Sequence, residues 1–95
     1  MSMIVAIGRF DLHLTEAQTL KEKRHIIKCL LDRIKAKFNA SIAEVDHNDL
    51  WQRSLIGVAV VANDRILLTK IGQRIEEILQ DHDQVRIMDL CWEYI

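Results

Sequence analysis

Residues 19–38, TLKEKRHIIKCLLDRIKAKF, decide the fold because they have the pattern of one uninterrupted amphipathic helix. Thr19 and Glu22 are spaced as in a capping box, in which the two side chains bind free backbone N–H groups of the first helical turn. At about 100° per residue, one sector of this helix is apolar. It predicts a core-facing stripe made of Leu20, Ile27, Leu30, Leu31, Ile34 and Phe38.

The same helix holds much of the positive charge of the chain. Residues 19–38 contain seven basic and two acidic residues, whereas the whole chain has a net charge of −1. Four of the basic residues share the sector beside the apolar stripe and form what we call the basic ridge: Lys21, Arg24, Lys28 and Lys35. A charge run is most often a solvated helix face, but a one-sided ridge also suits a phosphate backbone or an acidic partner. We therefore count the ridge, together with Lys23, as candidate RNA- or partner-binding residues.

Outside this helix, period-two alternation and turn residues predict four strands, at 3–14, 40–46, 54–62 and 85–93. A second helix is expected at 65–80, with a polar N-cap at 63–64 and an inner side lined by Leu67, Leu68, Ile71, Ile75, Ile78 and Leu79. This βαββαβ order favours an α+β, ferredoxin-like fold for a single domain, 1–95. Right-handed crossovers then give a four-stranded antiparallel sheet in the order 4-1-3-2, with both helices on one face.

The helix-free face of this sheet is expected to be partly apolar. The outward positions of the two central strands include Met3, Val5, Ile7, Leu55 and Val61. Contiguous exposed apolar surface tends to mark an interaction site. We therefore expect a homodimer or another partner contact through this face. In the last strand, the alternation places Met88 on the same side as Leu90, Trp92 and Tyr94, and opposite Ile87, Asp89, Cys91 and Glu93.

Residues 44–53, EVDHNDLWQR, form the second candidate region. Glu44, Asp46 and Asp49 are close together in sequence, but an oxygen-rich cation site needs about six ligands and a zinc site three or four well-placed groups. We therefore expect a solvated acidic turn, with no metal and no cofactor. Trp51 has two interpretations: a plug over the end of the core, or an aromatic anchor in an interface beside an arginine.

Several function classes are disfavoured. No apolar run approaches the roughly 20 residues that span a bilayer, no leader pattern is present, and two cysteines are too few for a disulfide framework, so we expect a cytoplasmic protein without membrane contact. RRM-type RNA readers stack bases on aromatic residues of the central strands, which here carry aliphatic, small or charged residues. The link at 13–18 lacks the Gly and Arg of an acylphosphatase loop, and no nucleophile–base set can be assembled. We therefore expect a protein that is not an enzyme.

The start MIVAIGRFDLHL, the TLKEKR helix opening and the segment FNASIAEVDHNDLWQRSLIGVAVVAND together resemble the small bacterial YlxP-like family, whose function is unknown. The resemblance covers nearly the whole chain and implies a ferredoxin-like domain. Genes of this family often lie beside those for translation-initiation and ribosome-binding factors, which implies a link to ribosome assembly or RNA handling. The positions that match the motifs of the family are Lys21, Glu22, Lys23, Arg24, Glu44, Asp46, Asp49, Trp51, Gln52 and Arg53.

The leading hypothesis is a cytoplasmic binding protein that contacts RNA or a ribosome-associated partner through the basic ridge and Trp51–Arg53. The alternative is a dimeric protein-interaction or small-ligand-binding module that acts through the helix-free face of the sheet. Charge reversal on the ridge should abolish RNA retention under the first hypothesis. Under the second, Val5→Asp should break the assembly.

Overall fold

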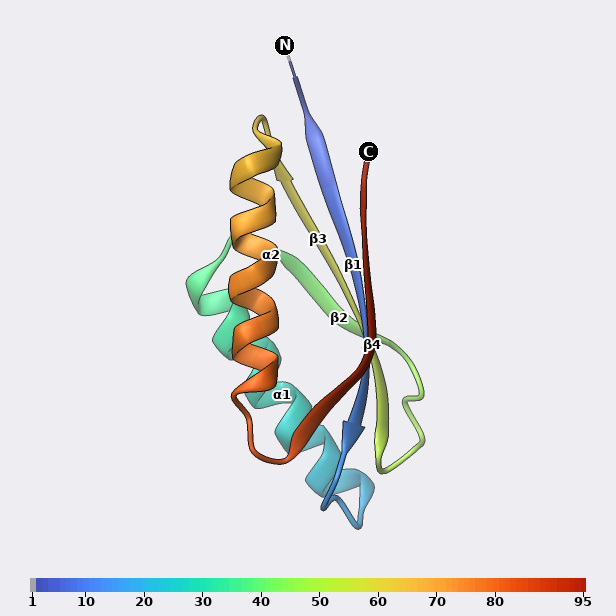
Figure 1. Ribbon diagram of the computed structural model, residues 1–95. Coiled ribbons are helices and arrows are strands. Elements are labelled where there is room, and N and C mark those ends of the chain that lie inside the picture. Colours follow the sequence, from blue (N-terminus) through green and yellow to red (C-terminus); the bar gives the residue numbers. More distant parts are fainter. Residues whose placement is uncertain (1) are drawn as a thin grey trace.

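The computed structural model describes residues 2–95, which form four strands and two helices in the predicted order (Figure 1). The elements are β1 (Ile4–Leu14), α1 (Leu20–Lys37), β2 (Ser41–Asp46), β3 (Arg53–Ala62), α2 (Arg65–Gln80) and β4 (Val85–Tyr94). The predicted bounds agree with the observed ones to within one residue, and those of α2 are identical. The periodicity of the sequence was therefore a sufficient guide to every element.

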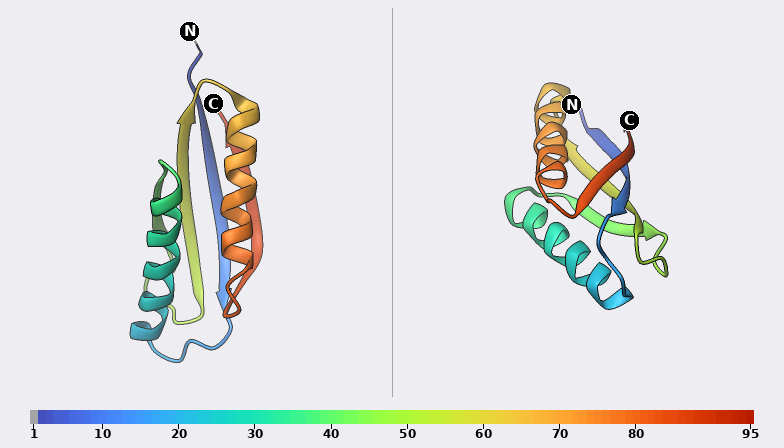
Figure 2. Two further views of the ribbon diagram at one scale, coloured as in Figure 1. Left: turned by 90° about the vertical axis from the view of Figure 1, so that its left-hand side faces the viewer. Right: turned by 60° about the horizontal axis from the view of Figure 1, so that its bottom comes forward.

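The four strands form one antiparallel sheet in the order β2-β3-β1-β4, which is the predicted order 4-1-3-2 counted from the opposite edge. β1 and β3 are the central strands, and they pair continuously from Ile4–Ala62 to His13–Arg53. Both helices lie on the same side of the sheet in Figure 1 and in the left view of Figure 2. The ferredoxin-like fold is thus confirmed, and it leaves one face of the sheet without helices. We call this the open face.

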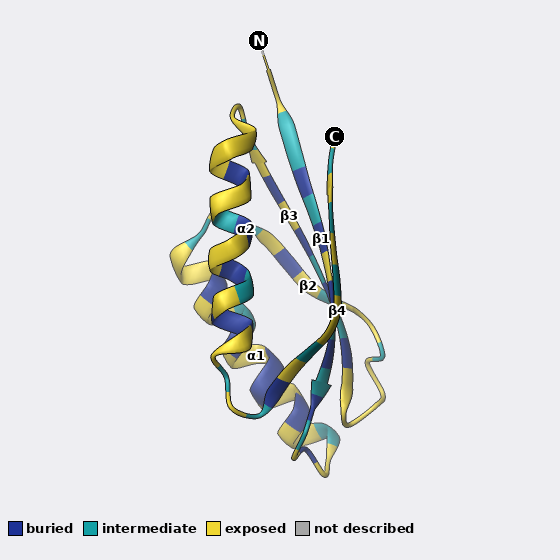
Figure 3. Ribbon diagram, in the orientation of Figure 1, coloured by how far each residue is buried: buried dark blue, intermediate teal, exposed yellow. Residues whose placement is uncertain are grey.

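The hydrophobic core lies between the sheet and the two helices. Alternate residues of β1 point into it, and Phe10, Leu12 and Leu14 are completely buried. Leu30 and Ile34 close the core from the side of α1. In Figure 3 the buried positions follow the facing sides of the helices and the sheet, whereas the outer sides of both helices are exposed.

Both helices begin with a side-chain cap, as predicted. The Thr19 hydroxyl accepts a hydrogen bond from the backbone N–H of Glu22 at 3.1 Å. The Glu22 carboxylate accepts one from the backbone N–H of Gln18 at 2.9 Å, one residue before the position that a capping box usually uses. Asp64 caps α2 by accepting from the backbone N–H of Ile66 at 2.9 Å. These contacts satisfy N–H groups that have no partner inside a helix.

Trp92 of β4 fills the space between the sheet and α2. Its ring meets Phe10 edge-on with the ring centroids 5.5 Å apart, and its indole N–H donates to Glu76 at 2.8 Å. Two glycines leave room for this ring. A Cβ atom at Gly8 would lie 2.7 Å from Cζ3 of Trp92, and one at Gly72 would lie 3.0 Å from Cζ2.

Two details of the packing differ from the prediction. Leu67, which the sequence predicts on the inner side of the second helix, is 47% exposed because it lies at the edge of the buried sector in the first turn of α2. In β4, the pairing with β1 shifts by one residue between Asp11 and Leu12. Such a bulge inverts the alternation of a strand, so Ile87 packs against the core and Met88 is exposed.

Candidate nucleic-acid interface

The basic ridge of α1 is exposed to solvent along its whole length: Lys21, Arg24, Lys28 and Lys35 are all exposed. At about 100° per residue, the four side chains lie within roughly 60° of one another around the helix axis. At a rise of about 1.5 Å per residue, they extend over roughly 21 Å. The ridge is therefore a straight line of cations on a helix whose start is held by a cap.

Three of the four ridge cations are unpaired within the described part of the chain. Lys28 donates a hydrogen bond to Asp32 at 2.7 Å, whereas no carboxylate oxygen of residues 2–95 lies within 4.0 Å of Lys21, Arg24 or Lys35. The hydrogen bond raises the pKa of Lys28 above its ordinary value and lowers the pKa of Asp32. Lys28 thus stays cationic, but Asp32 neutralises part of its charge.

Lys23 does not belong to this surface, so its assignment to the binding residues is wrong. Its side chain is completely buried, with 0% exposure. The Lys23 Nζ atom lies 2.6 Å from a Glu44 carboxylate oxygen and donates to the backbone carbonyl of His47 at 2.6 Å. Glu44 also accepts a hydrogen bond from the Ser54 hydroxyl at 2.6 Å. Burial of a charge is tolerated when it is paired and hydrogen-bonded, and these contacts meet both conditions.

This buried pair holds the loop between β2 and β3 against the start of α1. The ammonium group of Lys23 also lies 3.4 Å from the carbonyl of Asn48, so it contacts two successive loop carbonyls. At the other end of the loop, the side-chain amide of Gln52 donates to the carbonyl of Ala17 at 3.0 Å. The loop and the start of α1 lie at the same end of the molecule in Figure 1 and in the right view of Figure 2. Gln52 is thus a structural residue of this junction.

The predicted acidic turn is only partly present. Asp46 and Asp49 are exposed, as expected, but Glu44 lies on the inner side of β2 and forms the buried pair. Glu44 is excluded from the turn because the alternation of β2 places its side chain on the same face as the buried Ile42. Of the three predicted carboxylates, only Asp46 and Asp49 are therefore exposed at the loop.

Trp51 is the exposed aromatic residue of the loop. Its exposed fraction is 53%, and the other four aromatic residues of the chain are buried or half-buried. Its neighbours Asp49, Leu50 and Arg53 help it to line a shallow depression of about 370 Å³. The structure therefore excludes the interpretation of Trp51 as a plug over the core and leaves its ring available to a partner.

Arg53 faces a different surface from the ridge. It begins β3 on the open face, where its guanidinium donates to both carboxylate oxygens of Asp11, at 3.0 and 2.8 Å. A depression of about 600 Å³ lies beside this ion pair, bordered by His13, Met88 and Asp89. The sequence groups Arg53 with Trp51 and the ridge. The structure keeps Arg53 beside Trp51, where both line one depression, but places the ridge on the opposite side of the sheet.

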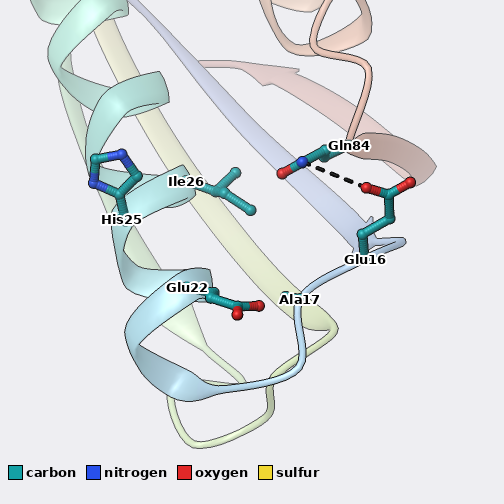
Figure 4. Close-up of a pocket in the computed structure, with 6 residues that line it drawn as sticks. All are labelled: Glu16, Ala17, Glu22, His25, Ile26 and Gln84. Atoms are coloured by element: carbon teal, nitrogen blue, oxygen red, sulfur yellow. Dashed lines mark hydrogen bonds between the residues drawn. The ribbon is translucent and has the colours of Figure 1, made fainter.

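On the other side of its apolar stripe, α1 carries both signs of charge: Glu22 near its start, and Arg33 and Lys37 towards its end. Figure 4 shows a pocket between this side of α1, the link before α1 and the turn before β4. The pocket has a volume of about 330 Å³ and is lined by Glu16, Ala17, Glu22, His25, Ile26 and Gln84. Two carboxylates, Glu16 and Glu22, border this pocket, so the pocket itself does not favour a phosphate group.

Within residues 2–95, no group of three or more His, Cys, Asp or Glu side chains is placed to hold a metal ion. Neither helix among these residues has the length and apolar character needed to cross a bilayer. Cys29 and Cys91 are both free and exposed.

Comparison with solved structures agrees with the fold. The chain is similar to a de novo designed protein, Foldit4, with a TM-score of 0.54 and 16% sequence identity over 99% of this chain and 97% of that one. It is also similar to a de novo designed protein with a ferredoxin fold, LFR1 1, with a TM-score of 0.50 and 18% identity over 100% of this chain and 84% of the other. At these identities, the similarity concerns the fold alone.

Sequence comparison gives the family. The chain is 37% identical over 70 residues to the uncharacterized protein YlxP of Bacillus subtilis (strain 168). These aligned residues cover 74% of this chain and 76% of that protein. The model of the family described as "Protein of unknown function (DUF503)" matches residues 5–91, and these include the ridge, the Lys23–Glu44 pair and the Trp51 loop. The chain therefore belongs to the DUF503 family.

Proposed function

We propose that this protein is a non-enzymatic RNA-contacting protein and that the basic ridge of α1 is its phosphate-contacting surface. The observation that carries this proposal is the exposure of four aligned cations, three of them without a carboxylate partner among residues 2–95. Unpaired lysines and arginines on a fixed scaffold are the groups that neutralise a phosphate backbone. The family resemblance implies a link to ribosome assembly, so we expect the contacted RNA to be ribosomal RNA.

The proposed contact is to the RNA backbone and is tolerant of base sequence. Arg and Lys contacts to phosphates position a protein on a nucleic acid without reading its sequence. Trp51 lies in the loop that Lys23 and Gln52 hold against the start of α1, and it adds one aromatic surface on which an unpaired base can stack. A single exposed ring supplies little discrimination among bases, because every base has a face that can stack.

Binding of this kind depends strongly on salt. Four phosphate contacts give a slope of about −3 in a plot of log affinity against log salt concentration, so the affinity falls roughly sixtyfold between 50 and 200 mM salt. A much flatter dependence would mean that the ridge does not carry the interaction.

The decisive experiment is the double charge reversal Lys21→Glu/Arg24→Glu, measured by retention of ribosomal RNA fragments on the immobilised protein. Lys28 is left unchanged because a glutamate there would repel Asp32 within the helix. We expect retention to be lost and the salt slope to become shallower by about two. The far-ultraviolet circular dichroism should stay unchanged, because both side chains are exposed.

The matched control is Arg65→Glu/Lys70→Glu on α2, which makes the same change in net charge at two other exposed positions that have no carboxylate partner among residues 2–95. We expect this variant to retain RNA nearly as well as the unmodified protein. Unchanged retention in the α1 variant would refute the proposal. Equal losses in the two variants would refute it as well, because they would mean that only the net charge of the protein matters.

A second candidate function is protein interaction through the open face of the sheet. The observation in its favour is the exposure there of aliphatic residues such as Met3 and Val61, which are 71% and 56% exposed. Val5→Asp should abolish such an interaction without changing RNA retention, whereas the α1 charge reversal should have the opposite effects.

A further inference from the structure

The open face of the sheet is divided into an apolar half and a polar half, and the polar half also contains the aliphatic side chains of Val45, Leu55 and Met88. The apolar half lies near the two chain ends and consists of Met3, Val5, Ile7, Ala59, Val61 and Ile95. These side chains are neighbours because Val5 pairs with Val61, and Val5 also exchanges two backbone hydrogen bonds with Ile95, at 2.7 and 3.0 Å. Val5 and Ile7 are half-buried and the other four are exposed. A contiguous apolar surface of this kind tends to mark an interaction site.

The polar half of the open face is close to electrically neutral. It holds three arginines and four carboxylates: Arg9, Arg53, Arg86, Asp11, Asp46, Asp89 and Glu93. Two ion pairs already form within it, Arg9–Glu93 at 3.3 Å and Arg53–Asp11 at 2.8 Å. A surface that meets its own copy must avoid a large net charge, because the copy repeats every charge. A surface built for RNA or for a strongly basic partner would carry one sign instead.

The dimensions of the open face fit a pair of copies. The four strands contain 11, 6, 10 and 10 residues. With a rise of about 3.3 Å per residue and a spacing of about 4.8 Å between strands, they cover roughly 600 Å². Two such faces bury roughly 1,200 Å², which is the lower end of the range for specific protein–protein interfaces.

We propose that the occupant of the open face is a second copy of this chain, so that two sheets pack face to face around their apolar halves. Sheets that pack in this way keep their strands within about 30° of one another, and the β-branched side chains of Val5, Ile7 and Val61 interdigitate with those of the partner. The helices remain outside. The dimer therefore presents two basic ridges on opposite surfaces. Dimer formation does not require RNA binding, so the two proposals can be tested separately.

The first test is the molar mass in solution, measured by light scattering or sedimentation up to high micromolar concentration. We expect the mass to rise towards twice the 11.1 kDa of one chain. Val61→Asp places an unpaired charge in the interface of each copy and should weaken the association at least about a hundredfold. Its matched control is Ile66→Asp, which changes another exposed aliphatic residue, on the helix side, and should leave the association unchanged.

The second test uses the two native cysteines as reporters. Cys91 lies on the open face opposite Arg9, whereas Cys29 lies on the exposed side of α1. We expect the alkylation rate of Cys91 to fall as the dimer forms and that of Cys29 to stay constant. A chain that remains monomeric at high micromolar concentration overturns the proposal. So does a dimer that survives Val61→Asp in a folded protein, or one that leaves Cys91 unprotected.

Discussion

The substitution Lys23→Met tests the role that the structure assigns to the buried lysine. It removes the ammonium group that contacts Glu44 and the carbonyls of His47 and Asn48, while a chain of similar length still fills the space. Glu44, whose side chain is only 14% exposed, then keeps Ser54 as its remaining hydrogen-bond donor. The substitution thus leaves a carboxylate in a poorly solvated position without a counterion.

The expected loss of stability is large for a single substitution. Removal of one partner from a buried ion pair costs about 3–5 kcal/mol. We place this case at about 3 kcal/mol, the lower end of that range, because Glu44 retains some contact with water. For a domain of this size, each kcal/mol lowers the melting temperature by about 4–8 °C, so we expect a decrease of roughly 12–24 °C.

The assay is urea unfolding followed by circular dichroism, with Lys21→Met as the matched control. Lys21 is two residues away on the same helix but exposed, so its substitution should change the unfolding free energy by less than about 0.5 kcal/mol. The double variant Lys23→Met/Glu44→Leu removes both charges and should be more stable than Lys23→Met alone by about 1–3 kcal/mol. A loss below about 1 kcal/mol for Lys23→Met, or additive effects in the double variant, would refute the reasoning.

Two further predictions concern single contacts. Asp32→Asn releases Lys28 from its ion pair. RNA affinity, measured by fluorescence anisotropy, should then rise severalfold, and the salt slope should steepen by up to about one. Unchanged affinity would mean that Lys28 contacts no phosphate. Gly8→Ala forces a methyl group against the ring of Trp92 and should cost about 1–3 kcal/mol in urea unfolding. Gly57→Ala, whose Cβ would meet only the half-exposed Val45 side chain at 3.1 Å, should cost less, and equal losses would contradict this account.

Lys23 is placed wrongly from the sequence because its positive charge was given more importance than its position on the helical wheel. On the helical wheel, Lys23 lies inside the apolar sector, between Leu30 and Ile34. Its angle therefore indicated burial, whereas its charge grouped it with the ridge. The alternation of β2 likewise places Glu44 on the inner side with Ile42. An inward lysine and an inward glutamate on neighbouring elements are a recognisable sign of a buried ion pair.

Periodicity and capping residues of the sequence alone determined the six elements, their bounds, the strand order and the identity of most core residues. This was possible because each of these depends on contacts within one element or on the packing of apolar faces. Only the tertiary structure decided which charges are available to a partner. Pairs such as Lys23–Glu44 and Arg53–Asp11 join residues far apart in the chain, and whether a side chain is neutralised depends on what the fold brings within hydrogen-bonding distance.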